Sequence, residues 1–169
     1  VNLTEKKYLS IIDAKTAELF RISCFLPTII TDQDKRTQKI FNDFGFNFGM
    51  AFQLSDDVLD YFGDSSKMGK SVGKDFFEGK VTYPVIHCFK KSDKKSKKII
   101  AKLFFKRKRS KKDLAVLLNL MKKTNTYKSS IEFVRKYAEK AKTNINKFEG
   151  NKYKVYLDEL VDHLIIRDK

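Results

Sequence analysis

The sequence predicts an all-α protein, built as a bundle of antiparallel helices. Glycine and proline, the residues that most often break helices, number only 7 and 2 in the 169 residues, so sites for turns are scarce. Apolar residues recur at the three- and four-residue spacing of a helix face, and no stretch alternates long enough to require a strand. Helices that bury one apolar stripe pack against one another, which favours a bundle.

The composition predicts a single cytoplasmic domain over residues 1–169. Hydrophobic residues make up 41% of the chain, enough for one core. The two cysteines, Cys24 and Cys88, indicate a reducing compartment. No stretch reaches the ~18 apolar residues of a membrane span, and no signal peptide opens the chain. The first residue is Val1, which fits either an alternative start codon or a chain that begins inside a longer ancestral sequence.

The N-terminal part is predicted to form three helical segments. The first covers residues 3–13, with Thr4 as its N-cap. It continues through residues 14–25, and Pro27 is expected to kink or end it because proline lacks an N–H. A polar turn then leads into a long helix over residues 34–62.

The long helix carries features that point to packing on more than one side. Gly45 and Gly49 are four residues apart, a spacing that allows a neighbouring helix to approach closely. The early helices hold too many phenylalanines for a single buried stripe, so they need several neighbours. These phenylalanines are Phe20, Phe25, Phe41, Phe44, Phe46, Phe48 and Phe52.

The remainder is predicted to be a long loop followed by five helices. Residues 63–80 hold too many glycines and charges for one regular element, and a loop longer than ~12–15 residues is often a functional lid or binding loop. Pro84 is expected in the first turn of the next helix. Further helical patterns cover residues 96–105, 111–123, 127–148 and 153–166.

The long helix ends in three carboxylates, Asp56, Asp57 and Asp60, within an otherwise apolar segment. The spacing places Asp56 and Asp60 on one face, one turn after Gln53, while Asp57 points about 100° away. Like charges four apart cost about 0.2–0.5 kcal/mol, so a nearby cation is expected. Mg²⁺, which takes carboxylate oxygens together with substrate phosphates, fits this face. The alternative is a solvated acidic turn near a helix end.

A lysine- and glycine-rich segment follows the carboxylates, and such a segment can set cations and backbone N–H groups around a polyphosphate. The whole block resembles the second aspartate-rich region of the trans-isoprenyl diphosphate synthases (polyprenyl synthases), whose pattern is F-Q-x-x-D-D-x-x-D, then G-K, D and G-K-x-T-x-P. The matching residues are Phe52-Gln53-Leu54-Ser55-Asp56-Asp57-Val58-Leu59-Asp60, Gly69-Lys70, Asp75 and Gly79-Lys80-Val81-Thr82-Tyr83-Pro84, with Lys15-Thr16 matching the family's upstream K-T pair.

The resemblance implies a helical bundle of the isoprenoid-synthase type and a prenyltransferase of isoprenoid biosynthesis. In that family an allylic diphosphate ionises, Mg²⁺ holds the departing pyrophosphate, and isopentenyl diphosphate attacks the allylic cation. By resemblance, Asp56 and Asp60 bind Mg²⁺ with Asp57 in support, and Asp75 steers the lysines of the loop. The residues implied to contact the allylic diphosphate are Lys15, Thr16, Gln53, Lys70 and Lys80.

The resemblance runs from about Tyr8 to the end, and the ending resembles that of long-chain, octaprenyl-type synthases, a hint of quinone side-chain precursors. Family members are about twice as long, and their first half carries another D-D-x-x-D. Only one such motif occurs here, so the chain is expected to be a C-terminal half-molecule. Three interpretations follow: an enzyme whose missing half is supplied by another chain, a non-catalytic subunit or inactive gene remnant, and a basic module that binds RNA or a membrane surface. The protein partner expected is a second copy in a homo-oligomer or a complementary chain that carries the N-terminal half.

A basic run between residues 90 and 112 contains Asp93 as its only acid and contributes to the formal charge of +15. Such a run can bind nucleic acid or an anionic membrane. The favoured interpretation is a solvated surface, and the ordered motif disfavours nucleic acid as a partner. The apolar residues within the run, predicted to be the buried stripe of a helix, are Ile99, Ile100, Leu103, Phe104 and Phe105.

Overall fold

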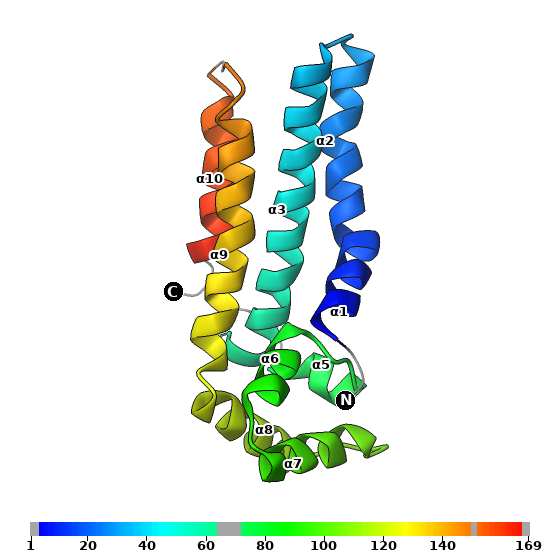
Figure 1. The fold of residues 1–169 in the computed structure, drawn as a ribbon, viewed down its shortest axis with the longest axis vertical. Coiled ribbons are helices and arrows are strands. Elements are labelled where there is room, and N and C mark those ends of the chain that lie inside the picture. Colours follow the sequence, from blue (N-terminus) through cyan, green and yellow to red (C-terminus); the bar gives the residue numbers. More distant parts are fainter. Residues whose placement is uncertain (1–3, 64–71, 150–151, 167–169) are drawn as a thin grey trace. The chain divides into compact units, whose positions relative to one another are not determined.

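The structure, a computed structural model, describes residues 4–63, 72–149 and 152–166 (Figure 1). Every regular element within these ranges is a helix, which confirms the all-α prediction. The elements are α1 (Glu5–Ile12), the π-helical turn η1 (Asp13–Ala17), α2 (Glu18–Ile30), α3 (Lys35–Phe62), α5 (Lys74–Glu78), α6 (Tyr83–Lys91), α7 (Lys94–Phe105), α8 (Lys111–Lys123), α9 (Thr126–Ile145) and α10 (Lys154–Ile166).

The chain divides into two compact units. Unit 1 comprises Val1–Tyr8 and Asp56–Ile131, and unit 2 comprises Leu9–Ser55 and Glu132–Lys169. Helices α1, α3 and α9 contribute residues to both units. A single domain over the whole chain therefore stays a prediction. Within the described ranges, no helix has both the length and the apolar character needed to cross a membrane.

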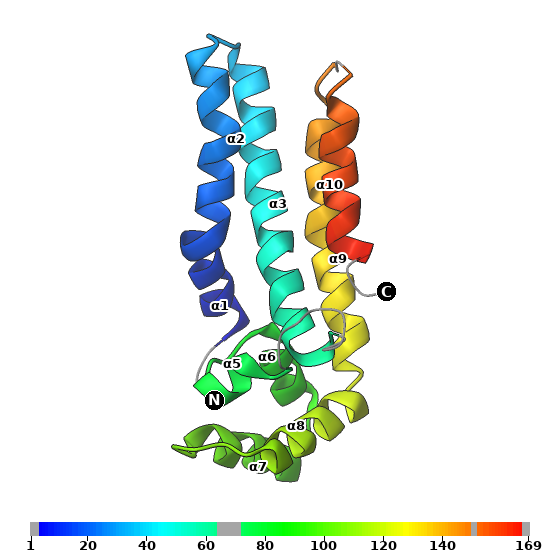
Figure 2. The same cartoon turned by 180° about the vertical axis from the view of Figure 1, so that it is seen from behind.

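Unit 2 contains two antiparallel helix pairs, α2 beside α3 and α9 beside α10, as both views show (Figures 1 and 2). The first pair is close because α3 presents glycines to it. A Cβ atom on Gly49 would lie 2.6 Å from the Cα of Ala17, and one on Gly45 would lie 2.6 Å from the carbonyl oxygen of Phe20. The prediction that these glycines serve helix packing is confirmed.

Replacing Gly49 with alanine is expected to lower the free energy of unfolding by about 1–2 kcal/mol. The added methyl group forces the backbone at Ala17 away, as overpacking does, and this outweighs the gain in helix propensity. Chemical denaturation of Gly49→Ala checks this result. Arg36→Ala, at an exposed position of the same helix, is the control and should stay within about 0.5 kcal/mol of the parent. Equal stability of parent and Gly49→Ala would contradict the close contact.

Pro27 was expected to kink or end its helix. Helix α2 continues through Pro27 to Ile30, so the predicted helix end at that point is wrong, and the kink stays a prediction. Proline removes a single hydrogen bond of the helix, and only three residues of α2 follow it. Two threonine hydroxyls add bonds there: Thr28 Oγ1 donates to the Phe25 carbonyl at 2.6 Å, and Thr31 Oγ1 donates to the Pro27 carbonyl at 2.8 Å.

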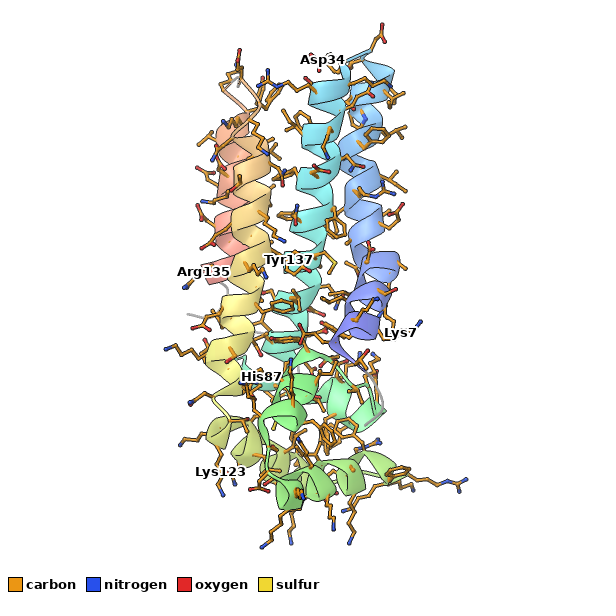
Figure 3. All side chains as sticks on the ribbon, in the orientation of Figure 1. Lys7, Asp34, His87, Lys123, Arg135 and Tyr137 are labelled. Atoms are coloured by element: carbon orange, nitrogen blue, oxygen red, sulfur yellow. The ribbon has the colours of Figure 1, made fainter. Side chains whose placement is uncertain are left out.

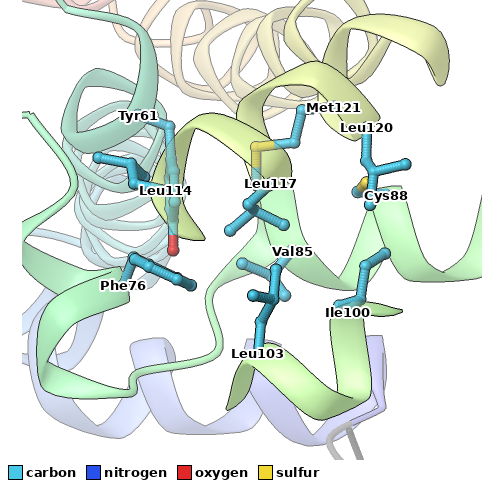
Figure 4. Packing of buried hydrophobic residues seen from close by; sticks show 10 residues of the cluster. All are labelled: Tyr61, Phe76, Val85, Cys88, Ile100, Leu103, Leu114, Leu117, Leu120 and Met121. Atoms are coloured by element: carbon cyan, nitrogen blue, oxygen red, sulfur yellow. The ribbon is translucent and has the colours of Figure 1, made fainter. Parts of the chain in front are cut away.

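Unit 1 has its own hydrophobic core, formed by residues of α3, α5, α6, α7 and α8 (Figure 4). Leu117, Met121 and Val85 are fully buried within it. Arg109 fixes the connection from α7 to α8, because its guanidinium donates to the carbonyl oxygens of Leu103 at 3.1 Å and Phe104 at 2.7 Å. The other buried members of the core are Tyr61, Phe76, Cys88, Ile100, Leu103, Leu114 and Leu120.

Two predictions in this unit need correction. The predicted loop over residues 63–80 contains a helix, α5, bracketed by Gly73 and Gly79 in the left-handed region, at φ of 84° and 78°. Ile99 and Phe105 do not join the buried stripe of α7, since their side chains are 36% and 86% exposed. Phe105 is the last residue of its helix and has no neighbouring turn above it.

Candidate functional site

Helix α3 presents its three carboxylates in three different environments. Asp56 is exposed, Asp60 is partly buried, and Asp57 is only 4% exposed. The helical phase accounts for the division, because Asp57 is rotated about 100° from Asp56 toward the core. The three residues of the motif are therefore not equivalent, as the predicted supporting role of Asp57 also implies.

Asp57 is held by Tyr8, a residue that was not among the site residues predicted from the sequence. The phenol of Tyr8 donates a hydrogen bond of 2.6 Å to Asp57 Oδ2. Burial raises the pKa of Tyr8 well above its ordinary value, and the Asp57 charge adds to this rise. Tyr8 therefore stays protonated and serves as a permanent donor to the buried carboxylate. No local pattern in the sequence could have revealed this pairing, because the residues are 49 positions apart.

Asp60 is tied to the start of α5. The backbone N–H of Asp75 donates to Asp60 Oδ2 at 3.0 Å, and the N–H of Gly73 donates to the Asp60 carbonyl at 2.6 Å. A carboxylate at the first turn of a helix is favoured by the unpaired N–H groups there. These bonds explain why the segment after residue 71 folds back onto the acidic end of α3.

Burial raises the pKa of Asp60 from 3.8 to about 6, and the charges of Asp75 and Asp56 add to this effect, while the backbone N–H groups of Asp75 and Lys74 oppose it. The ionised form of a carboxylate in this environment is stabilised by any cation that takes the place of the missing water. Asp56 and Asp60 also lie one turn apart on the same helix. Their donor chemistry and charge therefore fit a hard cation such as Mg²⁺.

Lys80 lies among acidic partners in the same unit. Its ammonium is 3.4 Å from Asp75 Oδ1 and 2.6 Å from Glu78 Oε2, yet its side chain is still 51% exposed. Asp75 thus contacts both a candidate phosphate-binding lysine and, through its N–H, the Asp60 carboxylate. This geometry agrees with a steering role for Asp75. Lys70, the other candidate lysine, lies outside the described residues.

Unit 2 contains the remaining candidates, Lys15 and Thr16 on the π-helical turn η1 and Gln53 on α3. Thr16 Oγ1 donates a hydrogen bond of 2.7 Å to Gln53 Oε1, which joins η1 to α3. The close approach at Gly49 lets the two elements meet over this short distance. Lys15 is exposed beside Thr16. Single π-helical turns often occur at functional sites, so η1 is an independent signal that the K-T pair is functional.

The carboxylates of the described residues do not make a complete metal cage by themselves. No group of three or more His, Cys, Asp or Glu side chains among residues 4–63, 72–149 and 152–166 could hold a metal ion. Mg²⁺ commonly keeps several waters and binds through one or two carboxylates plus substrate phosphates. The arrangement of Asp56 and Asp60 matches that second type of site.

Replacing Asp60 with asparagine is expected to stabilise the protein at pH 8 by about 1 kcal/mol. The folded-state pKa of about 6 exceeds the usual unfolded value, so the ionised carboxylate costs stability above pH 6, and this cost disappears below about pH 4. Because Asp60 is partly exposed, solvent screening makes the expected change in the free energy of unfolding smaller than the full pKa shift implies. The amide oxygen of asparagine can still accept the Asp75 N–H. Urea unfolding of parent and Asp60→Asn at pH 8 and pH 4 should show a difference only at pH 8; a difference that persists at pH 4 would contradict it.

Comparison with known proteins places the chain in a family. Residues 1–121 match the family described as polyprenyl synthetase. The chain is 32% identical to the geranylgeranyl pyrophosphate synthase of Geoglobus acetivorans, over 97% of this chain and 49% of that protein. It thus spans about half the length of the curated relatives it matches.

Solved structures give the same result. A decaprenyl diphosphate synthase from Rhodobacter capsulatus matches with a TM-score of 0.91 and 30% identity, over 99% of this chain and 52% of that one. A polyprenyl synthase from Caulobacter crescentus CB15, complexed with calcium and isoprenyl diphosphate, matches with a TM-score of 0.91 and 32% identity, over 99% and 51%. Since the family match covers more than half of the sequence, the chain belongs to the polyprenyl synthetase family.

Proposed function

We propose that the chain supplies the second aspartate-rich region of a trans-prenyltransferase that condenses isopentenyl diphosphate with an allylic diphosphate. The observation that carries the proposal is the pair Asp56 and Asp60 on α3, with Asp60 bonded to Asp75 and Asp75 paired with Lys80. Carboxylates beside a lysine suit a diphosphate group bound with a hard cation. Family membership supports the same chemistry.

In this reaction the carbon–oxygen bond to the allylic diphosphate breaks, a carbon–carbon bond to isopentenyl diphosphate forms, and one proton is lost, for which the released pyrophosphate is a suitable base. Bound Mg²⁺ would supply positive charge where the leaving group becomes more negative. Asp56 and Asp60 would hold the metal, and Asp57, fixed by Tyr8, would keep the helix end in place. The residues proposed to contact the diphosphate are Lys15, Thr16, Gln53, Lys70 and Lys80.

A non-hydrolysable allylic diphosphate, farnesyl S-thiolodiphosphate, is expected to bind the chain with Mg²⁺ and at least tenfold more weakly in EDTA, since the metal bridges carboxylates and phosphates. Isothermal calorimetry measures both affinities. The double variant Asp56→Asn/Asp60→Asn should lose the Mg²⁺ dependence. The control is Asp43→Asn, which makes the same change on the same helix at a residue paired with Lys39. Equal affinity with Mg²⁺ and in EDTA would eliminate the metal role.

We also propose that turnover needs a second aspartate-rich motif beyond the one found in these 169 residues, carried either by a continuation of the same polypeptide or by a complementary chain. Incorporation of radiolabelled isopentenyl diphosphate by the chain alone, and with a chain that carries the other motif, tests this requirement. Incorporation only in the mixture supports the enzyme. Absence of incorporation in the mixture favours a non-catalytic subunit or gene remnant. Chromatography of any product would test the predicted long-chain, octaprenyl-type length.

A further inference from the structure

Helix α7 carries a basic stripe that ends in an exposed aromatic residue. Ile100 and Leu103 are buried on one side of the helix. On the opposite side, Lys94, Lys98 and Lys102 follow one another at intervals of four residues, and all three are exposed. Phe105 comes three residues later on the same stripe and is 86% exposed. The exposed aromatic ring of Phe105 thus lies on the same helix face as the three lysines.

The acids nearby leave this charge uncompensated. Asp93 caps α7, with its carboxylate accepting the Ser96 N–H at 2.7 Å. Asp113 is paired with Lys106 at 2.5 Å. Figure 3 shows the nitrogen-tipped side chains that extend outward from α7 and α8. Between residues 94 and 112, the exposed basic residues that have no ion pair among the described residues are Lys94, Lys95, Lys98, Lys102, Arg107, Lys108, Lys111 and Lys112.

The α7–α8 connection holds Phe105 in this exposed position. Arg109 points inward, with its guanidinium 5.4 Å from the ring centroid of Phe104 and bonded to the carbonyls of Leu103 and Phe104. Phe104 and Arg109 therefore pack inward together while Phe105 projects into solvent. The exposure of Phe105 is set by folded contacts on both sides of it rather than by fraying of the helix end.

We propose that this face, consisting of the α7 stripe, Phe105 and the α7–α8 connection, docks onto an anionic phospholipid bilayer. Lysines along a helix are attracted to the negative headgroups, and a neighbouring aromatic ring enters the boundary between headgroups and acyl chains. Single-stranded nucleic acid fits less well. Proteins that bind single-stranded nucleic acid stack successive bases on several aromatic side chains. Among the described residues of α7, Phe105 is the one strongly exposed aromatic.

Flotation with lipid vesicles tests the docking, because bound protein rises with the vesicles while aggregates sink. The 169-residue chain is expected to float with vesicles of phosphatidylcholine and phosphatidylserine, but not with phosphatidylcholine alone, and to be released by high salt. Phe105→Ala should weaken binding about tenfold. Lys94→Gln/Lys98→Gln/Lys102→Gln should weaken it about a hundredfold. Thermal unfolding of each variant should match that of the parent, because these side chains are exposed.

Matched controls distinguish binding through this face from effects of net charge and from non-specific hydrophobic adsorption. The triple variant Lys128→Gln/Lys136→Gln/Lys140→Gln removes the same charge from exposed positions of α9, and Ile11→Ala removes another exposed apolar side chain. Both should bind vesicles within about twofold of the parent. Equal loss in the two triple variants would overturn the proposal, as would unchanged binding in Phe105→Ala. A fluorescent single-stranded RNA that loses affinity in the α7 variants, when vesicle binding is unaffected, would overturn it in favour of nucleic acid.

Discussion

Replacing Tyr8 with phenylalanine is expected to lower the free energy of unfolding by about 2–3 kcal/mol. The substitution removes the hydroxyl that donates to Asp57 at 2.6 Å and keeps the ring, so apolar packing is little changed. Tyr8 and Asp57 are only 3% and 4% exposed, so water cannot easily replace the lost donor. A buried carboxylate that loses one of its hydrogen bonds is less well stabilised, because water has little access to it. Urea denaturation at pH 8 measures the difference.

Asp56→Ala is the matched control, because it alters the neighbouring residue of the same motif at an exposed position. It should leave stability unchanged or slightly raised, since it removes a negative charge that acts on Asp60. A loss of several kcal/mol in this variant would show that Asp56 has a structural partner. An unchanged Tyr8→Phe variant would show that the Tyr8 hydroxyl contributes little to the fold.

The helices could be predicted because their signals are local. Thr4 caps α1 by accepting the Lys7 N–H at 3.2 Å, and Pro84 lies in the first turn of α6. The acidic face of α3 could also be predicted, since Asp56 and Asp60 are four residues apart and share a face in any helix. Each of these features depends on residues within a few positions of one another.

Features that depend on distant residues could not be predicted in the same way. The partner of Asp57 comes from α1, and the short helix α5 is positioned by bonds from Gly73 and Asp75 to Asp60. For α7, apolar composition suggested that Phe105 is buried, although its phase places it with the lysines. Phase is a better guide than composition at a helix end, where no further turn covers the last residue.

The second large expected effect concerns an uncovered apolar face of α2. Leu19, Ile22, Leu26, Ile29 and Ile30 share one side of this helix, and Leu19 and Ile30 are 68% and 74% exposed. The opposite side contacts Gly45 and Gly49 of α3. The chain purified alone is therefore expected to self-associate at micromolar concentration, because contiguous exposed apolar patches drive association. Size-exclusion chromatography with light scattering measures the mass directly.

Leu26→Lys/Ile30→Lys should convert the associated chain to a monomer, since two charges placed in this patch make its burial unfavourable. Val116→Lys adds a charge at an exposed apolar residue of α8, in the other unit, and should leave the mass unchanged. A complementary chain from a longer relative should likewise restore a single defined complex with the parent, and bind the double variant poorly, if it packs on the same face. A monomeric parent would show that this face does not associate. Association that persists in the double variant would place the contact elsewhere, and the exposed residues Tyr153, Val155, Tyr156 and Leu160 of unit 2 would then be the next to test.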